Sequence, residues 1–328
     1  MSPRYPSPRL SIRLTPSRKT KRRLRLVFGA ACFALGAAAC AAFGGASGRL
    51  MPNVALPTAG GTQLWTDVAY EHGWKVQRHA WTQHARLLDP AGVRRAWGAE
   101  DACCRRLDEA TATAAAAASP APLVVLLHGL ARSHRSLGTL AERLTDEGYE
   151  VLAFEYASTR AEIADHAAAL ATLLERHTAP REVHFVTHSL GGLVLRALLS
   201  DDDAPWRGVH RLGRAVTLAA PHGGAEVAET AAEWGLARWL LGPALVELGD
   251  GRAAALPAPP LPFATVAGVR EARAGWNPWV PGDDDGLVGA SEAHLAGEAA
   301  ALEHRVLHSF IMSDPEVLDW LVAFLAGP

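Results

Sequence analysis

Ser189 is the residue whose surroundings best suit chemistry. It stands in the run T-H-S-L-G-G at 187–192, directly after an apolar run at 183–187 and before a helical stretch at 193–198. A serine between a strand and a helix, with small residues beside it, is typical of a sharp turn that lifts the hydroxyl above a sheet. The sequence therefore predicts that Ser189 is a nucleophile.

The turn around Ser189 resembles the nucleophile elbow of α/β-hydrolases of the lipase and esterase kind. The usual pattern is G-x-S-x-G, and here the branched Thr187 replaces the first glycine. That departure motivates an alternative of another class, a non-catalytic binding or scaffold protein with a hydrolase fold. The resemblance covers about residues 120–328.

The resemblance implies an acid and then a histidine after the serine. The loop G-D-D-D-G-L-V at 282–288 resembles the D-G-x-V loop that carries the acid, which makes Asp285 the expected acid. His308 follows an expected short strand at 305–307 and precedes the last helix, where the family keeps its histidine. In this reading His308 takes the serine proton and Asp285 orients the imidazole. The alternatives are Asp283 and Asp284 for the acid and His304 for the histidine.

The rest of the expected site also follows from the resemblance. The run L-L-H-G-L at 126–130 is similar to the H-G-x oxyanion loop, so the backbone N–H groups of Leu130 and Leu190 are expected to bind the tetrahedral oxyanion. His128 would shape this loop. The candidate substrate-binding residues, each of which could equally pack in the core, are His188, His222, Trp234 and Trp239. The implied reaction needs no cofactor, and the four cysteines show no metal-ligand spacing.

The function that the resemblance implies is hydrolysis of carboxylic esters through an acyl-serine intermediate. A Trp- and Leu-rich cap expected at about 225–260 favours lipid-like substrates. An acyltransferase or a thioesterase remains an alternative on the same triad. An alcohol can accept the acyl group in place of water, and a thioester can form the same acyl-serine intermediate.

Apolar runs alternate with helical stretches along the part of the chain that carries these residues. Strands buried on both faces need continuous apolar runs, which stand at 123–127, 151–156, 183–187, 215–219 and 263–267. A helical stripe begins at Ile163, and Asp314 followed by proline is a good start for the final helix. The expected fold class is α/β, with a mostly parallel central sheet and helices on both faces.

The chain divides by composition into several segments. An Ala-rich linker at 111–122 separates a Trp-rich segment at 60–110 from the expected hydrolase domain at 123–328. The Trp-rich segment would either supply leading strands to the main sheet or cover one of its edges.

The charge distribution excludes a nucleic-acid partner. Residues 1–25 hold nine of the 32 basic residues and no acid, so 23 basic residues face 34 acidic ones in the remainder. An acidic body repels phosphate backbones at long range. With 49% hydrophobic residues the chain is globular. The sequence gives no indication of protein partners.

The basic n-region at 1–25 precedes 21 uncharged residues at 26–46, of which 13 are Ala or Gly. As a helix this segment would span about 31 Å, enough for a bilayer, and it also has the features of a cleavable export signal. We therefore expect a membrane-anchored or exported protein, such as one in a bacterial inner membrane with an outward-facing domain, or a periplasmic or secreted one. The run A-A-A-C at 37–40 leaves a lipoprotein cleavage site as an alternative.

Overall fold

The computed structural model describes residues 62–112, 121–176, 180–224, 242–249 and 251–327. Contacts divide the chain into two units, residues 1–47 and 48–328, and the described ranges lie in the second. The expected n-region and apolar segment, Trp234, Trp239 and most of the linker lie outside the described residues. No helix in the described ranges is long and apolar enough to cross a bilayer.

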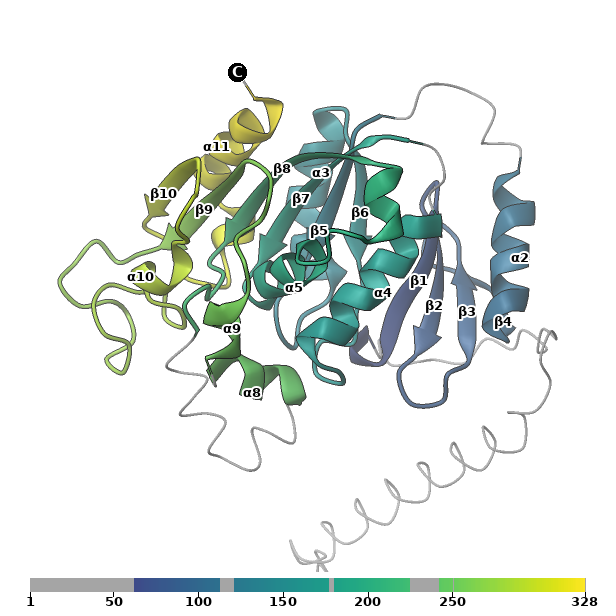
Figure 1. The fold of residues 1–328 in the computed structure, drawn as a ribbon, viewed down its shortest axis with the longest axis horizontal. Coiled ribbons are helices and arrows are strands. Elements are labelled where there is room, and N and C mark those ends of the chain that lie inside the picture. Colours follow the sequence, from purple (N-terminus) through teal and green to yellow (C-terminus); the bar gives the residue numbers. More distant parts are fainter. Residues whose placement is uncertain (1–61, 113–120, 177–179, 225–241, 250, 328) are drawn as a thin grey trace, which may run out of the picture. The chain divides into compact units, whose positions relative to one another are not determined.

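Six parallel strands form the central sheet (Figure 1). Their spatial order is β10 (Ala300–His304), β9 (Phe263–Gly268), β8 (Arg211–Leu218), β7 (Glu182–His188), β5 (Leu123–Leu127) and β6 (Glu150–Phe154). The inner strands are buried on both faces: Val125 belongs to one apolar cluster, and its neighbour Val124 belongs to the other. This is the burial that continuous apolar runs predict. The expected α/β class with a parallel central sheet is confirmed.

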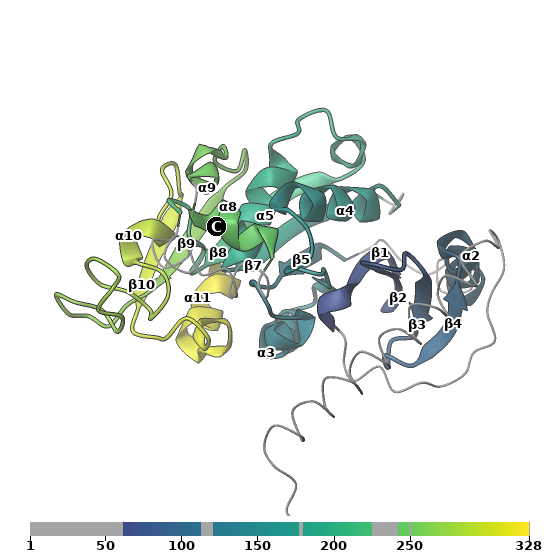
Figure 2. The ribbon, with the colours of Figure 1, turned by 90° about the horizontal axis from the view of Figure 1, so that it is seen from below.

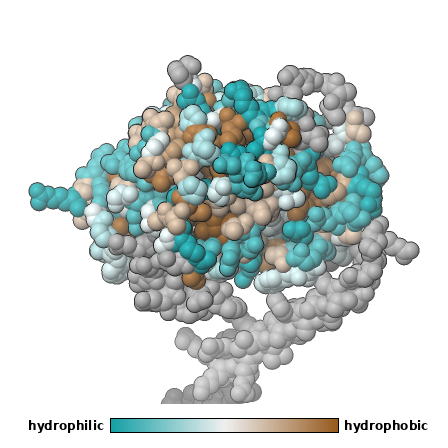
Figure 3. All heavy atoms as spheres, in the orientation of Figure 1, coloured by the Kyte–Doolittle hydropathy of each residue, from teal (hydrophilic) through white to brown (hydrophobic). Residues whose placement is uncertain are grey.

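Helices lie on both faces of this sheet (Figure 2). The pair α4 (Ile163–Arg176) and α5 (Leu190–Leu199) covers one face, and α3 (Gly138–Asp146) and α11 (Pro315–Ala326) cover the other. Helix α4 has buried and exposed residues in alternation, as expected for an amphipathic helix whose apolar stripe faces the sheet, and the face of the molecule seen in Figure 3 mixes apolar and polar residues. In α5 all residues except Ala197 are buried.

The C-terminal elements correct one expectation. Asp314 caps α11 by accepting the N–H groups of Glu316 and Val317, as the sequence predicts. The expected strand at 305–307 is wrong. Strand β10 ends at His304, whose partner in β9 is the terminal residue of that strand, so the chain beyond it has no strand to pair with and forms a loop.

The Trp-rich segment forms a separate four-stranded antiparallel sheet. Its strands are β1 (Trp65–Glu71), β2 (Trp74–His79), β3 (Ala85–Leu88) and β4 (Arg94–Gly98), and α2 (Glu100–Thr111) packs against them. Strand β1 lies beside the edge strand β6, where the N–H of Asp67 donates to the carbonyl of Glu155 at 2.8 Å. The segment therefore borders the central sheet without joining its ladder.

The described part of the expected cap holds two short helices, α8 (Pro243–Gly249) and α9 (Arg252–Ala255). Their buried residues Ala244, Leu245 and Ala253 belong to the core cluster that includes α4 and α5. The remaining short elements are α10 (Ala290–Ala293) and the 3-10 turns η1 (Thr62–Leu64), η2 (His134–Leu137), η3 (Pro205–Gly208) and η4 (Ile311–Ser313).

Candidate active site

Ser189 lies between β7 and α5 with an unusual backbone conformation, φ 55° and ψ −124°. A positive φ is rare for a residue with a side chain and marks stored strain. Two hydrogen bonds hold it: the N–H of Ser189 donates to the carbonyl of Leu218 at 2.9 Å, and the N–H of Gly192 donates to the carbonyl of Ser189 at 3.0 Å. The serine therefore stands on a sharp turn at the carboxyl end of a central strand.

The small residues of the turn have a steric reason. A methyl group at Gly191 would lie 2.6 Å from the carbonyl oxygen of Leu127, and one at Gly192 would lie 2.4 Å from Cβ of Ala220. Both glycines let α5 start close to the sheet. Thr187 stays within β7, and its branched side chain does not prevent the turn.

Asp285 and His308 contact each other through side chain and backbone. Nδ1 of His308 lies 2.7 Å from Oδ2 of Asp285, and the His308 N–H donates to the Asp285 carbonyl at 2.9 Å. The other carboxylate oxygen accepts the N–H groups of Leu287 at 3.0 Å and Val288 at 2.8 Å. Asp285 is 1% exposed, so water does not compete for these hydrogen bonds, and they fix the orientation of the carboxylate toward the imidazole.

His188, the residue before the serine, holds the histidine loop from its other side. Its Nε2 lies 3.0 Å from the carbonyl oxygen of His308, and the two rings lie 4.7 Å apart. Burial, followed by the charge of His308, lowers the pKa of His188 well below its ordinary value. A neutral His188 must carry its proton on Nε2 to donate to that carbonyl. His188 thus connects the nucleophile turn to His308.

Ser189 Oγ and His308 Nε2 form no direct hydrogen bond within the described part of the chain. Such bonds are often long without substrate and tighten when it binds.

The alternative acids and the alternative histidine have other partners. Asp283 accepts the N–H groups of Arg270 at 2.7 Å and Ala272 at 3.0 Å, while Asp284 accepts that of Gly286 at 2.6 Å. Nε2 of His304 lies 3.1 Å from Oδ1 of Asp314, at the start of α11. None of these contacts involves the imidazole of His308, so the geometry favours Asp285 and His308 as the pair.

The loop after β5 lies against the nucleophile. A methyl group at Gly129 would be 2.9 Å from Nδ1 of His188 and 3.1 Å from Cβ of Ser189, so the glycine permits this approach. Within the described ranges, the N–H groups of Leu130 and Leu190 donate to no acceptor. Leu190 is the first residue of α5, where an N–H lacks an intrahelical partner and favours an anion. Both N–H groups are therefore free to bind an oxyanion.

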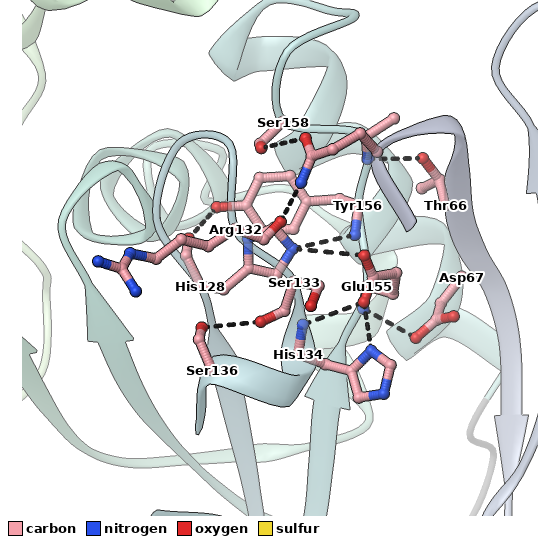
Figure 4. Close-up of polar contacts among 12 residues, drawn as sticks. Thr66, Asp67, His128, Arg132, Ser133, His134, Ser136, Glu155, Tyr156 and Ser158 are labelled. Carbon is pink, nitrogen blue, oxygen red and sulfur yellow. Dashed lines mark hydrogen bonds and ion pairs between the residues drawn. The ribbon is translucent and has the colours of Figure 1, made fainter. Parts of the chain in front are cut away.

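His128, the first residue of this loop, is buried, and Figure 4 shows its side chain beside Tyr156. Its ring stacks on Tyr156 with centroids 4.1 Å apart, and the Tyr156 hydroxyl donates to the His128 carbonyl. Burial lowers the pKa of His128 to about 3, so the ring is neutral. These contacts suit a residue that shapes the loop.

A buried chain of hydrogen bonds connects the N-terminal sheet to this region (Figure 4). Glu155 accepts the backbone N–H of His134 at 3.0 Å and also contacts its ring, while the Glu155 N–H donates to Asp67 at 2.9 Å. Asp67 in turn accepts from Nζ of Lys75 at 3.0 Å. Burial raises the pKa of Glu155. Sequence reasoning missed this network, although an acid inside the apolar run at 151–156 was a signal for it.

The structure describes two of the four predicted substrate-binding residues, His188 and His222. His222 is buried, and its Nε2 lies 3.0 Å from Oγ1 of Thr217. Since His188 is buried too, the structure gives both histidines contacts within the protein, and their role in substrate binding stays a prediction. Trp234 and Trp239 lie outside the described residues. Among the described residues, no three His, Cys, Asp or Glu side chains are grouped to hold a metal.

Exposed apolar side chains surround the acid and the histidine. Leu287 is 47% exposed, Leu307 40% and Phe310 60%. A methyl group at Gly286 would lie 3.6 Å from Cδ2 of Leu307, so the two loops are in contact. Trp279, 83% exposed, lies on a neighbouring loop. We call Leu287, Leu307 and Phe310 the apolar rim.

Comparisons with known proteins agree with this architecture. A family model described as a domain of unknown function (DUF7379) matches residues 95–241. No curated protein matches the chain. Among solved structures, the mature lipase BlEst2 of Bacillus licheniformis superposes with a TM-score of 0.50 and 21% identity, covering 64% of this chain and 93% of that chain.

Two further structures are similar at lower scores. The product of gene lin2722 from Listeria innocua has a TM-score of 0.44 and 18% identity, covering 64% of this chain and 95% of that chain. A metagenomic carboxyl esterase has a TM-score of 0.41 and 20% identity, covering 59% and 66%. The structural match to α/β-hydrolase lipases and esterases confirms the resemblance expected from the sequence at the level of the fold.

Proposed function

We propose that this protein is a serine hydrolase that cleaves carboxylic esters, with Ser189 as nucleophile, His308 as base and Asp285 as the orienting acid. The observation that carries the proposal is the 2.7 Å contact of His308 Nδ1 with Asp285 Oδ2, beside a serine on a strained turn. The esterase-like fold supports ester substrates in general.

In the proposed reaction Ser189 Oγ attacks the ester carbonyl while His308 Nε2 takes its proton. The oxyanion that forms binds the N–H groups of Leu130 and Leu190. Collapse of this intermediate breaks the bond to the alcohol, which leaves with the proton from His308. Water, deprotonated by the same imidazole, then attacks the acyl-serine; as the acyl–oxygen bond breaks and the acid leaves, His308 returns the proton to Ser189 Oγ.

The apolar rim supports lipid-like esters. Exposed Leu and Phe side chains beside the reacting groups lose contact with water when an acyl chain or lipid surface covers them, which contributes about 25 cal/mol per Å². A length series of p-nitrophenyl esters tests this directly. The proposal expects kcat/KM to rise with acyl length; activity confined to the shortest chains would contradict it.

A fluorophosphonate probe tests the nucleophile, because it reacts covalently only with an activated serine. Labelling is expected for the wild type and for Ser200→Ala, an exposed control at the other end of α5, and it should vanish for Ser189→Ala. A folded wild-type protein that takes no label would favour the non-catalytic scaffold instead. Adding an alcohol during turnover shows whether the acyl group passes to water or to the alcohol.

We also propose that residues 26–46 anchor the protein in a membrane or direct its export. The block of basic residues followed by 21 uncharged ones supports this. A tryptic peptide that spans Ala39, recovered from membrane fractions, would identify an anchor, and a mature N-terminus beyond residue 40 would identify a cleaved signal. Intact protein found only in the cytosolic fraction would contradict both.

A further inference from the structure

Arg132 is a half-buried cation close to the reacting groups. It follows Leu130 by two residues, and its N–H donates to the carbonyl of Gly129 at 3.2 Å. Its own carbonyl accepts from Nε2 of Gln63. The backbone of Arg132 is thus held from both sides, at a fixed position relative to the loop that contacts Ser189.

The guanidinium reaches across to the histidine loop. Nη2 of Arg132 donates to Oγ of Ser309 at 2.6 Å, and Ser309 directly follows His308. Figure 4 shows the guanidinium extending away from His134 and Glu155, so it does not belong to the buried network beneath the loop. The charge therefore lies between the two loops that carry Leu130 and His308.

No carboxylate balances this charge within the described ranges. Arg196, which is fully buried, instead donates to three backbone carbonyls, and Arg143 and Arg181 pair with acids. A neutral hydroxyl compensates a guanidinium poorly, and burial lowers the pKa of Arg132. Among the residues that the structure describes, one of its five side-chain N–H donors is used, which leaves a planar fork suited to phosphate or carboxylate oxygens.

We propose that Arg132 binds an anionic group, a phosphate or carboxylate, on the alcohol side of the ester substrate. This inference rests on the proposed function, in which His308 gives its proton to the leaving alcohol oxygen. The alcohol must then lie toward His308, which is where Arg132 reaches Ser309. With the apolar rim beside it, the site suits an amphiphilic ester with an anionic headgroup.

The test compares three esters of the same acyl length. One has glycerol phosphate as its alcohol, one has glycerol, and one is a glycerol ester with a carboxylate at the end of the acyl chain. Arg132→Gln should lower the ratio of kcat/KM for the phosphate ester over the neutral ester by roughly 10–100-fold. Arg132→Lys should recover part of that ratio, since it keeps the charge without the fork. Arg135→Gln, an exposed control three residues later, should leave the ratio unchanged.

Two outcomes overturn the inference while leaving the proposed function standing. An unchanged kcat/KM ratio in Arg132→Gln means that Arg132 does not bind the anionic group. An effect on the acyl-carboxylate ester alone means that Arg132 binds an anion on the acyl side of the ester and not on the alcohol side. If the wild type hydrolyses no ester, the proposed function fails first. In that case, calorimetry with glycerol 3-phosphate tests the anion site on the Ser189→Ala protein. We expect this variant to bind glycerol 3-phosphate and the double variant Ser189→Ala/Arg132→Gln not to bind it. Absence of binding to Ser189→Ala would also overturn the inference.

Discussion

His308 binds Asp285 twice, through its imidazole Nδ1 at 2.7 Å and through its backbone N–H at 2.9 Å. The backbone bond holds the peptide group of His308 beside Asp285, and the ring cannot turn without losing its own contact with the Asp285 carboxylate. His188 holds the His308 carbonyl from the opposite side at 3.0 Å. The proposed base is thus positioned by the acid loop and by the residue next to the proposed nucleophile.

Asp285→Asn should abolish most activity with little loss of fold. Asn can keep an oxygen facing the N–H groups of Leu287 and Val288, but its amide then presents a donor to His308 Nδ1 and imposes the wrong tautomer. We expect kcat/KM on a short p-nitrophenyl ester to fall by about 10⁴-fold. Asp283→Asn is the matched control and should keep activity within about tenfold of wild type. A large loss in Asp283→Asn with little loss in Asp285→Asn would indicate that Asp283 is the orienting acid.

His188→Phe should lower kcat by removing the donor to the His308 carbonyl while keeping a ring in the buried space. A misplacement of about 1 Å at the base costs on the order of 10²-fold. His188→Gln, whose amide can donate to the same carbonyl, should recover part of the loss. Single-turnover kinetics separate this from substrate binding. Equal activities for the two variants would show that His188 only fills space.

Gly191→Ala should destabilise the fold, because its methyl would lie 2.6 Å from the carbonyl oxygen of Leu127 and force α5 away from β5. Overpacking of this kind costs about 1–3 kcal/mol. Gly138→Ala, in open space and already helical, should instead stabilise the protein slightly. Urea denaturation measures both. Similar stabilities for the two variants would contradict the close contact of α5 with β5.

Acid should destabilise the protein partly through His222. Burial lowers its pKa from 6.5 to about 3, so the unfolded state binds its proton first as the pH falls. The free energy of unfolding should be unaffected by this residue above pH 6.5 and decrease between pH 6.5 and 3, by about 1.4 kcal/mol per pH unit at most. Urea titrations from pH 7 to 4 should show a shallower decrease for His222→Gln. An unchanged slope would mean that His222 is not neutral in the fold.

Asp67→Ala should loosen the N-terminal sheet from the edge of β6. It removes the carboxylate that pairs with the Lys75 ammonium and leaves the Glu155 N–H without its acceptor, and removal of one partner of a buried pair costs about 3–5 kcal/mol. Lys75→Met in the same protein should return part of this stability. Hydrogen exchange at β1 and β2 should rise in the single variant. No change in exchange there would show that apolar packing alone holds the sheet.

The sequence by itself determined the features that depend on neighbouring residues. Continuous apolar runs specify strands buried on both faces, small residues after Ser189 permit its turn, and Asp314 with the following proline starts α11. Within a run of three aspartates, the motif around Asp285 also favoured the one whose carboxylate contacts His308, because its position relative to Gly286 is local.

Only the tertiary structure decided which distant groups meet. Arg132 and Ser309 are 177 residues apart, and Asp67 and Glu155 are 88 apart. Such pairs are set by strand order and by how sheet edges face each other, which no local period or spacing encodes. The same reason explains why His304 and His308, four residues apart, take different partners: one ends a strand beside α11, and the other lies in the loop that returns to Asp285.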